Sequence, residues 1–257
     1  MELLVKNNDL THGKIWKVIL NFTLPIFLGT LFQSLYTTID AIIIGKFAGK
    51  DAFAAIESVM SFQRLPVSFF IGLSSGATII ISQYFGAKEK EDVSKASHTA
   101  MSFAIIGGLI LSILSCLLSP YFIGLIKVPQ KIFHEAYIYT FICFSGMVFS
   151  MIYNIGSGIL RALGNSKTPF HILILANILN IFLDLIFVIK FDLSVVGVGL
   201  ATLISQIVSA ILIFMVLMRT DLDCRIYIKK LTFYKKYLKK IFGLGLPIAV
   251  QSVIYPI

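Results

Sequence analysis

The sequence predicts an all-α integral membrane protein, built as a six-helix transmembrane bundle followed by the start of a seventh helix. Of its 257 residues, 57% are apolar and only 14% are charged, and the mean hydropathy is +0.90. Soluble domains contain about 25% charged residues, so this is the composition of a chain whose main solvent is the bilayer. The apolar residues gather in long runs, and these runs define the expected elements.

Six of the apolar runs are long enough to cross the bilayer, which takes about 20 helical residues. They lie at about Ile15–Ile44, Phe53–Phe85, Val93–Ile126, Ile132–Leu160, Pro169–Ile189 and Val195–Met218. Strands of a transmembrane barrel need only about ten residues, so the runs predict helices. A proline inside a helix predicts a kink, and we expect the first helix to bend at Pro25. Thr168 and Pro169 are typical of a helix start, with the threonine as cap.

The basic residues between the runs predict the orientation, because Lys and Arg concentrate on the cytoplasmic side. Sixteen of them fall in the N-terminal tail and the second, fourth and sixth loops, against five on the other side. We expect a cytoplasmic tail over residues 1–14, a six-helix lobe over 15–218 and a basic cytoplasmic linker over 219–240. The linker alternates basic and apolar side chains, which favours a surface helix on anionic lipid over a specific anion or nucleic-acid partner.

A seventh apolar run covers Ile241–Ile257. Its segment Gly245-Leu246-Pro247-Ile248-Ala249 resembles Thr23-Leu24-Pro25-Ile26-Phe27 of the first helix. Coming after six helices, this match predicts two parallel six-helix halves related by an axis along the membrane normal. We therefore interpret the chain as one half plus the start of the next, over residues 241–257. Gly72 and Gly76 would permit close helix approach within the bundle.

Enzyme and metal-cluster chemistry are not indicated. The cysteines Cys116, Cys143 and Cys224 lie far apart and outside any CxxC pattern, and the four histidines have no HExxH spacing. No nucleophile, base and orienting group occur together, so we expect neither an enzyme nor a cofactor. The net charge of +9 comes mostly from residues between the apolar runs, so we expect no nucleic-acid partner.

Asp40 and Asp184 fall clearly inside the apolar runs, where a charged side chain costs a few kcal/mol and usually marks an ion or substrate path. Each ends a polar stripe on one helix face, and the two stripes are Gln33, Tyr36, Thr37 and Asp40, and Asn177, Asn180 and Asp184.

The expected topology places Asp40, Asp184 and Thr202 at one depth, roughly 6–11 Å inside the outer boundary. Two carboxylates, an amide and a hydroxyl could then meet. Oxygen ligands suit Na⁺, and two like charges in a low dielectric suit a proton, so the spacing leaves the ion open. The alternative is that either aspartate caps a helix end or hydrogen-bonds a neighbour.

Several motifs resemble those of the multidrug and toxic compound extrusion (MATE) transporters. The most specific is Leu160-Arg161-Ala162-Leu163-Gly164-Asn165-Ser166-Lys167-Thr168-Pro169, which is similar to that family's loop between helices 4 and 5. Further similar segments are Asp40–Gly45, Gly72–Ala77 and Gly197–Thr202. One departure is Leu185, since family members often carry a proline directly after the helix 5 aspartate.

The resemblance implies a proton- or sodium-driven antiporter of the cell inner membrane that exports cationic amphipathic compounds through a V-shaped pair of six-helix lobes. It also implies residue roles that follow the prokaryotic branch named for DNA-damage induction. The cation or proton site would comprise Asp40, Asn180, Asp184 and Thr202. The hinge of helix 1 would be Pro25. The substrate cavity would comprise Gln33, Tyr36, Tyr139, Asn154, Asn177 and Gln206.

The family has roughly twice this length, so we expect transport to need a second six-helix lobe as partner. Our hypothesis is that an outside ion binds at Asp40 and Asp184 and biases helix 1 between straight and bent forms. Two other functions stay open. A lipid-linked saccharide flippase of the same superfamily would want a basic cavity, whereas these helices carry acids, and in a non-transporting membrane scaffold the acids would be structural.

Overall fold

Eight α-helices and three short helical turns make up nearly all of residues 14–254, which are the residues described by the structure, a computed structural model. The predicted tail, residues 1–14, lies almost wholly outside this range. No residue in the described part forms a strand, which confirms the all-α prediction. The helices are α1 (Ile15–Ile43), α2 (Lys50–Gly86), α3 (Lys90–Leu125), α4 (Gln130–Ser145), α5 (Met147–Ala162), α6 (Lys167–Asp184), α7 (Ser194–Arg219) and α8 (Lys235–Ile254). The turns are the π-helical η1 (Ile44–Ala48) and η2 (Leu185–Lys190) and the 3₁₀-helical η3 (Ile228–Lys230).

Six helices in the described range are long and apolar enough to cross a membrane, and they are α1 with η1, α2, α3, α6 with η2, α7 and α8. The pair α4 and α5 forms one further span, bent by 43° at a single-residue break. The six predicted spans therefore correspond to α1–α7, and the predicted start of a seventh corresponds to α8. The chain is a multi-pass membrane protein.

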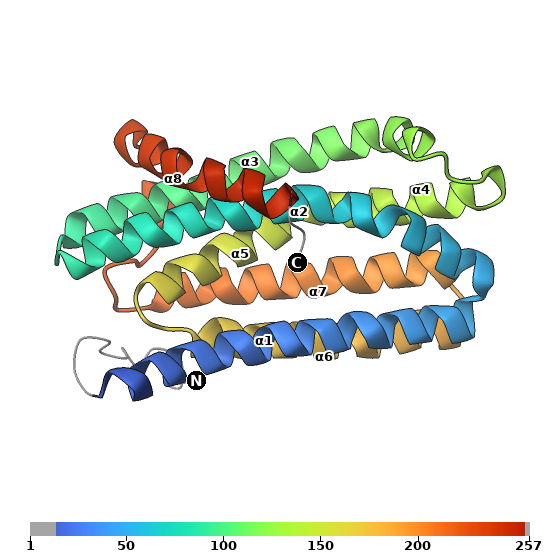
Figure 1. The fold of residues 1–257 in the computed structure, drawn as a ribbon, viewed down its shortest axis with the longest axis horizontal. Helices are drawn as coiled ribbons and strands as arrows, with labels where there is room; N and C mark the ends of the chain where they lie inside the picture. The colour runs from blue at the N-terminus through green and yellow to red at the C-terminus, as the bar shows by residue number, and fades with distance from the viewer. Residues whose placement is uncertain (1–13, 255–257) are drawn as a thin grey trace.

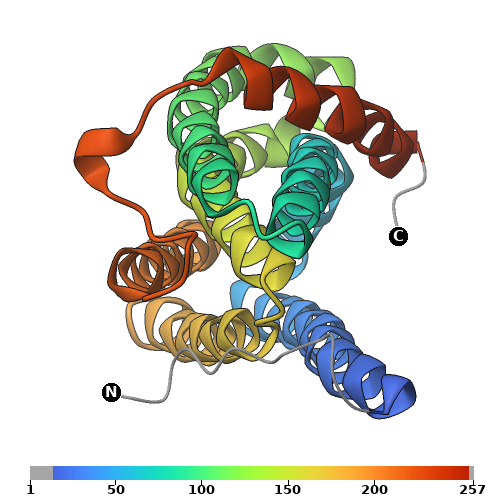
Figure 2. The same ribbon diagram turned by 90° about the vertical axis from the view of Figure 1, so that its left-hand side faces the viewer.

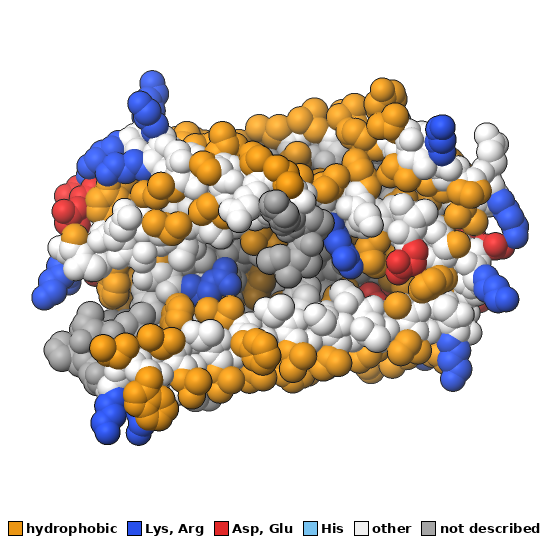
Figure 3. Space-filling view, in the orientation of Figure 1, with side chains coloured by type: hydrophobic (Ala, Val, Ile, Leu, Met, Phe, Trp, Pro, Cys, Tyr) orange, Lys and Arg blue, Asp and Glu red, His pale blue; other side chains and the backbone are white. Residues whose placement is uncertain are grey.

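The spans lie side by side along the long axis of the molecule (Figure 1). Seen down that axis, α5 lies centrally, with α2 and α3 on one side of it and α6 and α7 on the other (Figure 2). The helix α1 packs on α6, and α8 packs along α2. On the face drawn in Figure 3, apolar side chains cover much of the length of the bundle, and most Lys and Arg side chains lie near its two ends.

The first helix runs through its proline without interruption. Pro25 and Pro66 both lie inside continuous helices, as expected for kinks rather than breaks. However, α1 shows no pronounced bend at Pro25 (Figure 1), so the bent form that we expected is not the conformation of this structure.

The connection between α5 and α6 explains the residues of the most specific sequence motif. Gly164 adopts φ +85°, Asn165 N–H donates to Leu160 O (3.0 Å), and Gly164 N–H donates to Arg161 O (3.0 Å). This is a Schellman motif, in which a glycine accepts the left-handed conformation that ends a helix. The sequence predicted Thr168 as the cap of α6, but α6 begins at Lys167 and the residue at its N-cap position is Ser166. Thr168 lies in the first turn, and its N–H donates to Asn165 Oδ1 (3.1 Å).

The linker is not the surface helix that its composition predicted. Residues 220–234 are irregular apart from η3, and α8 begins at Lys235, before the expected start at Ile241. Cys224 and Ile226 are buried against the core formed by α2, α3, α5 and α7. The alternation of basic and apolar residues thus belongs to an irregular segment, residues 220–234, which we call the strap. A few of its side chains point inward, and it is not a helix with one apolar face.

The break between α4 and α5 is stabilised by a neighbouring helix. A bent span leaves carbonyl groups without their helical partners. Ser112 Oγ on α3 donates to Phe144 O (2.5 Å) and reaches Ser145 O (3.1 Å), the last carbonyls before Gly146. The hydrogen bonds from Ser112 therefore stabilise the bend, and the candidate site lies beside it.

Candidate ion-binding site between three spans

The buried centre of the candidate site is the C-terminal turn of α6. Asp184 is the last residue of this helix and is fully buried, and Asn180 lies one turn earlier and is also buried. The Asn180 side-chain amide donates to Asp184 Oδ2 (3.0 Å) and accepts from Thr202 N–H of α7 (3.1 Å). One amide therefore fixes the Asp184 carboxyl and joins α6 to α7.

The helix α1 brings the second carboxyl to this point. The Asp40 side chain lies near the Asp184 carboxyl and the Tyr36 side chain, and Tyr36, Asp40 and Thr202 line one cavity. Asp40 is only 8% exposed. The structure therefore brings together Asp40, Asn180, Asp184 and Thr202, the four residues predicted as the ion site.

Both aspartates lie next to an irregularity in the helical backbone. The π-helical turn η1 begins four residues after Asp40, and η2 begins directly after Asp184, at Leu185. The two turns contact each other. π-Helical turns inside α-helices occur frequently at functional sites. The two turns lie at the same ends of α1 and α6 as the two aspartates, which supports a functional site there.

Three buried oxygen atoms at the site have no hydrogen-bond partner among the described residues. They are Asp40 Oδ1, Asp184 Oδ1 and Gln206 Oε1. None of the ion pairs in the described part of the chain involves either aspartate. All three atoms are acceptors, and an unpaired buried acceptor is costly, so the site suits a ligand that supplies positive charge or donors.

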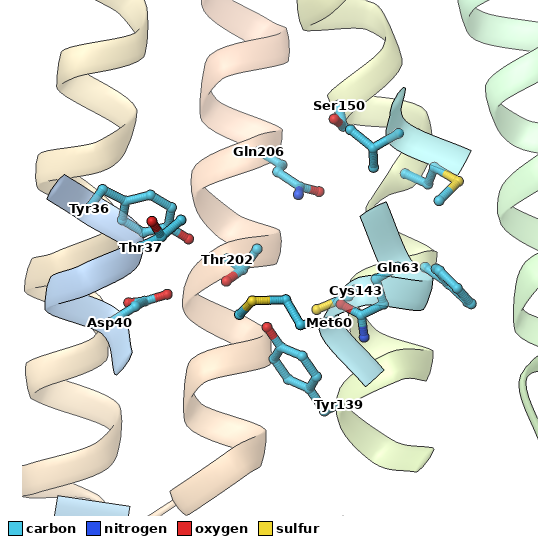
Figure 4. A pocket seen from close by; sticks show the side chains of 13 residues that line it. Tyr36, Thr37, Asp40, Met60, Gln63, Tyr139, Cys143, Ser150, Thr202 and Gln206 are labelled. Atoms are coloured by element: carbon cyan, nitrogen blue, oxygen red, sulfur yellow. The ribbon is translucent and has the colours of Figure 1, made fainter. Parts of the chain in front are cut away.

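A cavity of about 120 Å³ adjoins the Asp40 carboxyl group (Figure 4). A water molecule takes up about 30 Å³, whereas pockets for drug-sized ligands measure about 300–1,000 Å³. The cavity therefore has room for an ion with a few waters. Its lining residues come from α1, α2, α4, α5 and α7, and they are Tyr36, Thr37, Asp40, Met60, Gln63, Val67, Tyr139, Cys143, Phe144, Met147, Ser150, Thr202 and Gln206.

Only half of the predicted cavity residues line this cavity. Tyr36, Tyr139 and Gln206 do so, whereas Gln33, Asn154 and Asn177 do not. Gln33 is exposed on α1. Asn154 Nδ2 donates to Ser150 O within α5 (2.8 Å), and Asn154 O accepts from Ser74 Oγ of α2 (3.0 Å), so this residue packs two helices together.

The sequence predicted Tyr139 of the broken span but none of the cavity residues on α2, and it predicted neither Cys143 nor Ser150. Met60, Gln63 and Val67 follow helical spacing on α2, but methionine and valine at such spacing are typical of any packed helix face. Cys143 and Ser150 lie on either side of the break, which the sequence did not predict. Besides the carboxylates, the side chains at the site offer amide and hydroxyl oxygens as possible ligand atoms. No group of three or more His, Cys, Asp or Glu residues in the described range could hold a metal ion together.

These features define a multi-pass helical membrane protein with a buried, oxygen-lined site where three of its spans meet. The chain belongs to the MatE family, whose family profile matches residues 25–186.

Named relatives and solved structures agree with this assignment. The chain is 29% identical over 251 residues to the probable multidrug resistance protein YoeA of Bacillus subtilis (strain 168), covering 93% of this chain and 53% of YoeA. It is 28% identical over 249 residues to the multidrug export protein MepA of Staphylococcus aureus (strain NCTC 8325 / PS 47), again covering 93% and 53%. The chain thus spans about half the length of these relatives.

The fold matches solved transporters over almost the whole chain. The outward-facing conformation of a multidrug resistance MATE family transporter of the MOP superfamily superposes with a TM-score of 0.88 at 25% identity, covering 98% of this chain and 56% of that one. A MOP superfamily transporter from Pyrococcus furiosus Vc1 (DSM3638) gives a TM-score of 0.89 at 25% identity, with the same coverage.

Proposed function

We propose that this chain is the N-terminal half of an antiporter, coupled to H⁺ or Na⁺, that exports cationic amphipathic compounds. The observation that carries the proposal is the set of buried acceptors without partners, Asp40 Oδ1, Asp184 Oδ1 and Gln206 Oε1. Two carboxylates that face each other in a low dielectric repel strongly, and a proton or a monovalent cation between them removes the repulsion. YoeA is a probable multidrug resistance protein and MepA a multidrug export protein, and the similarity of this chain to both supports a drug-like substrate class.

The ion would act by changing where α1 lies. Asp40 and Tyr36 belong to α1, whereas Asp184 and Thr202 belong to α6 and α7. A bound cation would draw α1 toward the other two helices, and loss of the cation would separate them. Pro25 lies fifteen residues before Asp40 in the same helix, where a missing backbone amide makes bending cheaper. Ion binding would thereby shift the population between straight and bent forms of α1.

The cavity wall argues against the flippase alternative. Its lining residues include Asp40 and no Lys or Arg, whereas a pyrophosphate-bearing lipid would want basic side chains. The half-length match to the relatives supports a second six-helix lobe as the partner with which this half would enclose a substrate path. We further propose an inner-membrane location with the N-terminus in the cytoplasm, on the distribution of Lys and Arg between the loops.

Ion binding can be tested on the chain by itself. Thermal unfolding in detergent micelles would be followed as Na⁺ is added at constant ionic strength and, separately, as the pH is lowered. We expect the unfolding midpoint to rise with one of the two ions and the rise to vanish in the Asp40→Asn/Asp184→Asn variant. Asp51→Asn is the matched control, because Asp51 is an exposed acid that pairs with Lys131 (2.7 Å). An equal ion response in the double variant would support the scaffold alternative.

Transport needs the two-lobe protein. In cells that produce this half together with the second lobe, we expect efflux of a fluorescent cationic dye to stop in the Asp40→Asn variant while membrane expression stays normal. Undiminished dye export by that variant, at equal expression, would contradict the proposed coupling role of Asp40.

A further inference from the structure

The strap, residues 220–234, is fastened to the lobe along its backbone. Ile226 N–H donates to Leu217 O at the end of α7 (2.9 Å), and Tyr227 N–H donates to His98 Nε2 on α3 (3.0 Å). Tyr234 N–H donates to Thr99 Oγ1, also on α3 (3.3 Å). With Cys224 and Ile226 buried beneath it, the strap has a fixed path, and the side chains that point away from the lobe are held in place.

The outward side of the strap combines large apolar and basic side chains. Ile228 is 63% exposed, and Lys229 and Lys230 beside it are also exposed. These three residues form η3, which Figure 2 shows as the part of the strap farthest from the helices. The strap carries Asp221 and Asp223 before Arg225, and Asp223 pairs with Lys90 of α3 (3.8 Å). From Arg225 through Lys240, which includes the first residues of α8, the sequence contains seven basic residues and no acid. No salt bridge in the described part of the chain uses Lys229 or Lys230.

The attachment points on α3 place the strap at the level of the lipid headgroups. The helix α3 has 36 residues and is therefore about 54 Å long, whereas the hydrocarbon core is about 30 Å thick. With α3 upright and centred on the core, about 12 Å of it would extend beyond the core at each end. His98 lies eight residues from the start of α3, so it lies about 12 Å along the helix. The strap is attached to α3 at this level, so it lies beside the boundary between the lipid headgroups and the acyl chains.

We propose that η3, formed by Ile228, Lys229 and Lys230, anchors this end of the lobe to anionic phospholipids. Ile228 would enter the boundary between headgroups and acyl chains, and the two lysines would bind lipid phosphates, as basic amphipathic segments do at membrane surfaces. The charge of η3 selects this occupant, because an apolar side chain followed by two lysines without a carboxylate partner complements an anionic headgroup layer and not a neutral one. Lys230 also lies over the Tyr227 ring, 5.0 Å from its centroid.

The test uses the chain in nanodiscs that contain phosphatidylglycerol and phosphatidylcholine. Trp16 is the sequence's one tryptophan, so Trp16→Phe/Ile228→Trp places a single fluorophore on η3. We expect blue-shifted emission and stronger quenching when the bromine atoms are on phosphatidylglycerol than when they are on phosphatidylcholine, with a preference that weakens as salt is added. Water-like emission without quenching would overturn the proposal.

Two further variants separate lipid charge from simple burial. Lys229→Gln/Lys230→Gln should abolish the preference for phosphatidylglycerol while the tryptophan stays quenched by both lipids. The matched control is Lys88→Gln/Lys167→Gln, which removes two exposed lysines at the same end of the bundle, away from η3, and should keep the preference. An unchanged preference in the first pair, or an equal loss in the control pair, would contradict the proposal. Phe233→Trp, at a second exposed position of the strap, serves if the Ile228 variant does not fold.

Discussion

Gln206 on α7 occupies the space that a side chain at Gly146 would need, since a Cβ atom there would lie 2.5 Å from Gln206 Oε1. Gly146 is also the break between α4 and α5. Residues before the break, such as Cys143, and after it, such as Met147, line the same cavity as Gln206. The break in this span and one wall of the cavity therefore meet at one close contact.

Gly146→Ala should lower the free energy of unfolding by about 1 kcal/mol, because the ends of two flexible side chains, Gln206 Oε1 and Leu203 Cδ1, must move to make room. The measurement is thermal or denaturant unfolding in micelles. Gly124→Ala is the control, since a Cβ there meets nothing within 4 Å. Adding Gln206→Ala to Gly146→Ala should restore part of the loss. A Gly146→Ala variant as stable as the control would show that the contact is not tight.

Asn180→Leu keeps the approximate volume of the side chain but removes the amide that donates to Asp184 Oδ2 and accepts from Thr202 N–H. We expect a loss of about 1–3 kcal/mol in unfolding free energy, the cost of leaving a buried acceptor unpaired. Combining it with Asp184→Leu should cost less than the sum of the two changes, because the two residues interact directly. Strict additivity in this double-mutant cycle would contradict the contact.

The meeting of Asp40 with Asp184 could be predicted because it depends on two regular quantities. The rise per residue sets the depth of each acid in its span, and the alternating direction of spans sets which ends coincide. The sequence determines less well which residues of a helix face the cavity. Gln33 shares a polar stripe with Asp40 in the sequence, yet it is exposed. The Asn154 side chain donates to Ser150 O of its own helix and does not line the cavity.

The break at Gly146 and the path of the strap could not be predicted, because both depend on partners distant in the sequence. A glycine inside an apolar run is compatible with a straight helix, and this span is held bent by Ser112 of α3. Likewise, the amides of Tyr227 and Tyr234 do not need a helix of their own, since His98 and Thr99 accept from them. The residue pattern of one segment gives no information about partners that lie far away in the sequence.

Gly72→Ala should weaken the docking of α8 on α2. A Cβ at Gly72 would lie 2.3 Å from Ala249 Cα, a backbone atom that cannot move unless the helices separate. We expect about 2–3 kcal/mol lower stability and faster hydrogen exchange of the α8 amides, with α6 and α7 unaffected. The matched control is Gly86→Ala in the same helix, where a Cβ meets nothing within 4 Å. Unchanged exchange in α8 would contradict the close packing.

Burial raises the pKa of the Cys224 thiol in the strap to about 12. In the unfolded chain a cysteine has a pKa of about 8.5. Because the folded value is higher, the stability linked to keeping this thiol neutral is fully present below about pH 8.5 and is lost as the pH rises from there toward 12. A Cys224→Ala variant lacks this ionisation.

The stability difference between the parent chain and Cys224→Ala should therefore shrink as the pH rises above about 8.5, and it should stay constant at lower pH. The measurement is the unfolding midpoint of both proteins across this range, with the other two cysteines replaced by alanine in each. In the same background, a maleimide reagent at neutral pH should leave the folded chain unlabelled, because Cys224 is fully buried, and should label it in denaturant. Rapid labelling of the folded chain would mean that the strap opens, and it would contradict the fixed path inferred from its hydrogen bonds to His98 and Thr99.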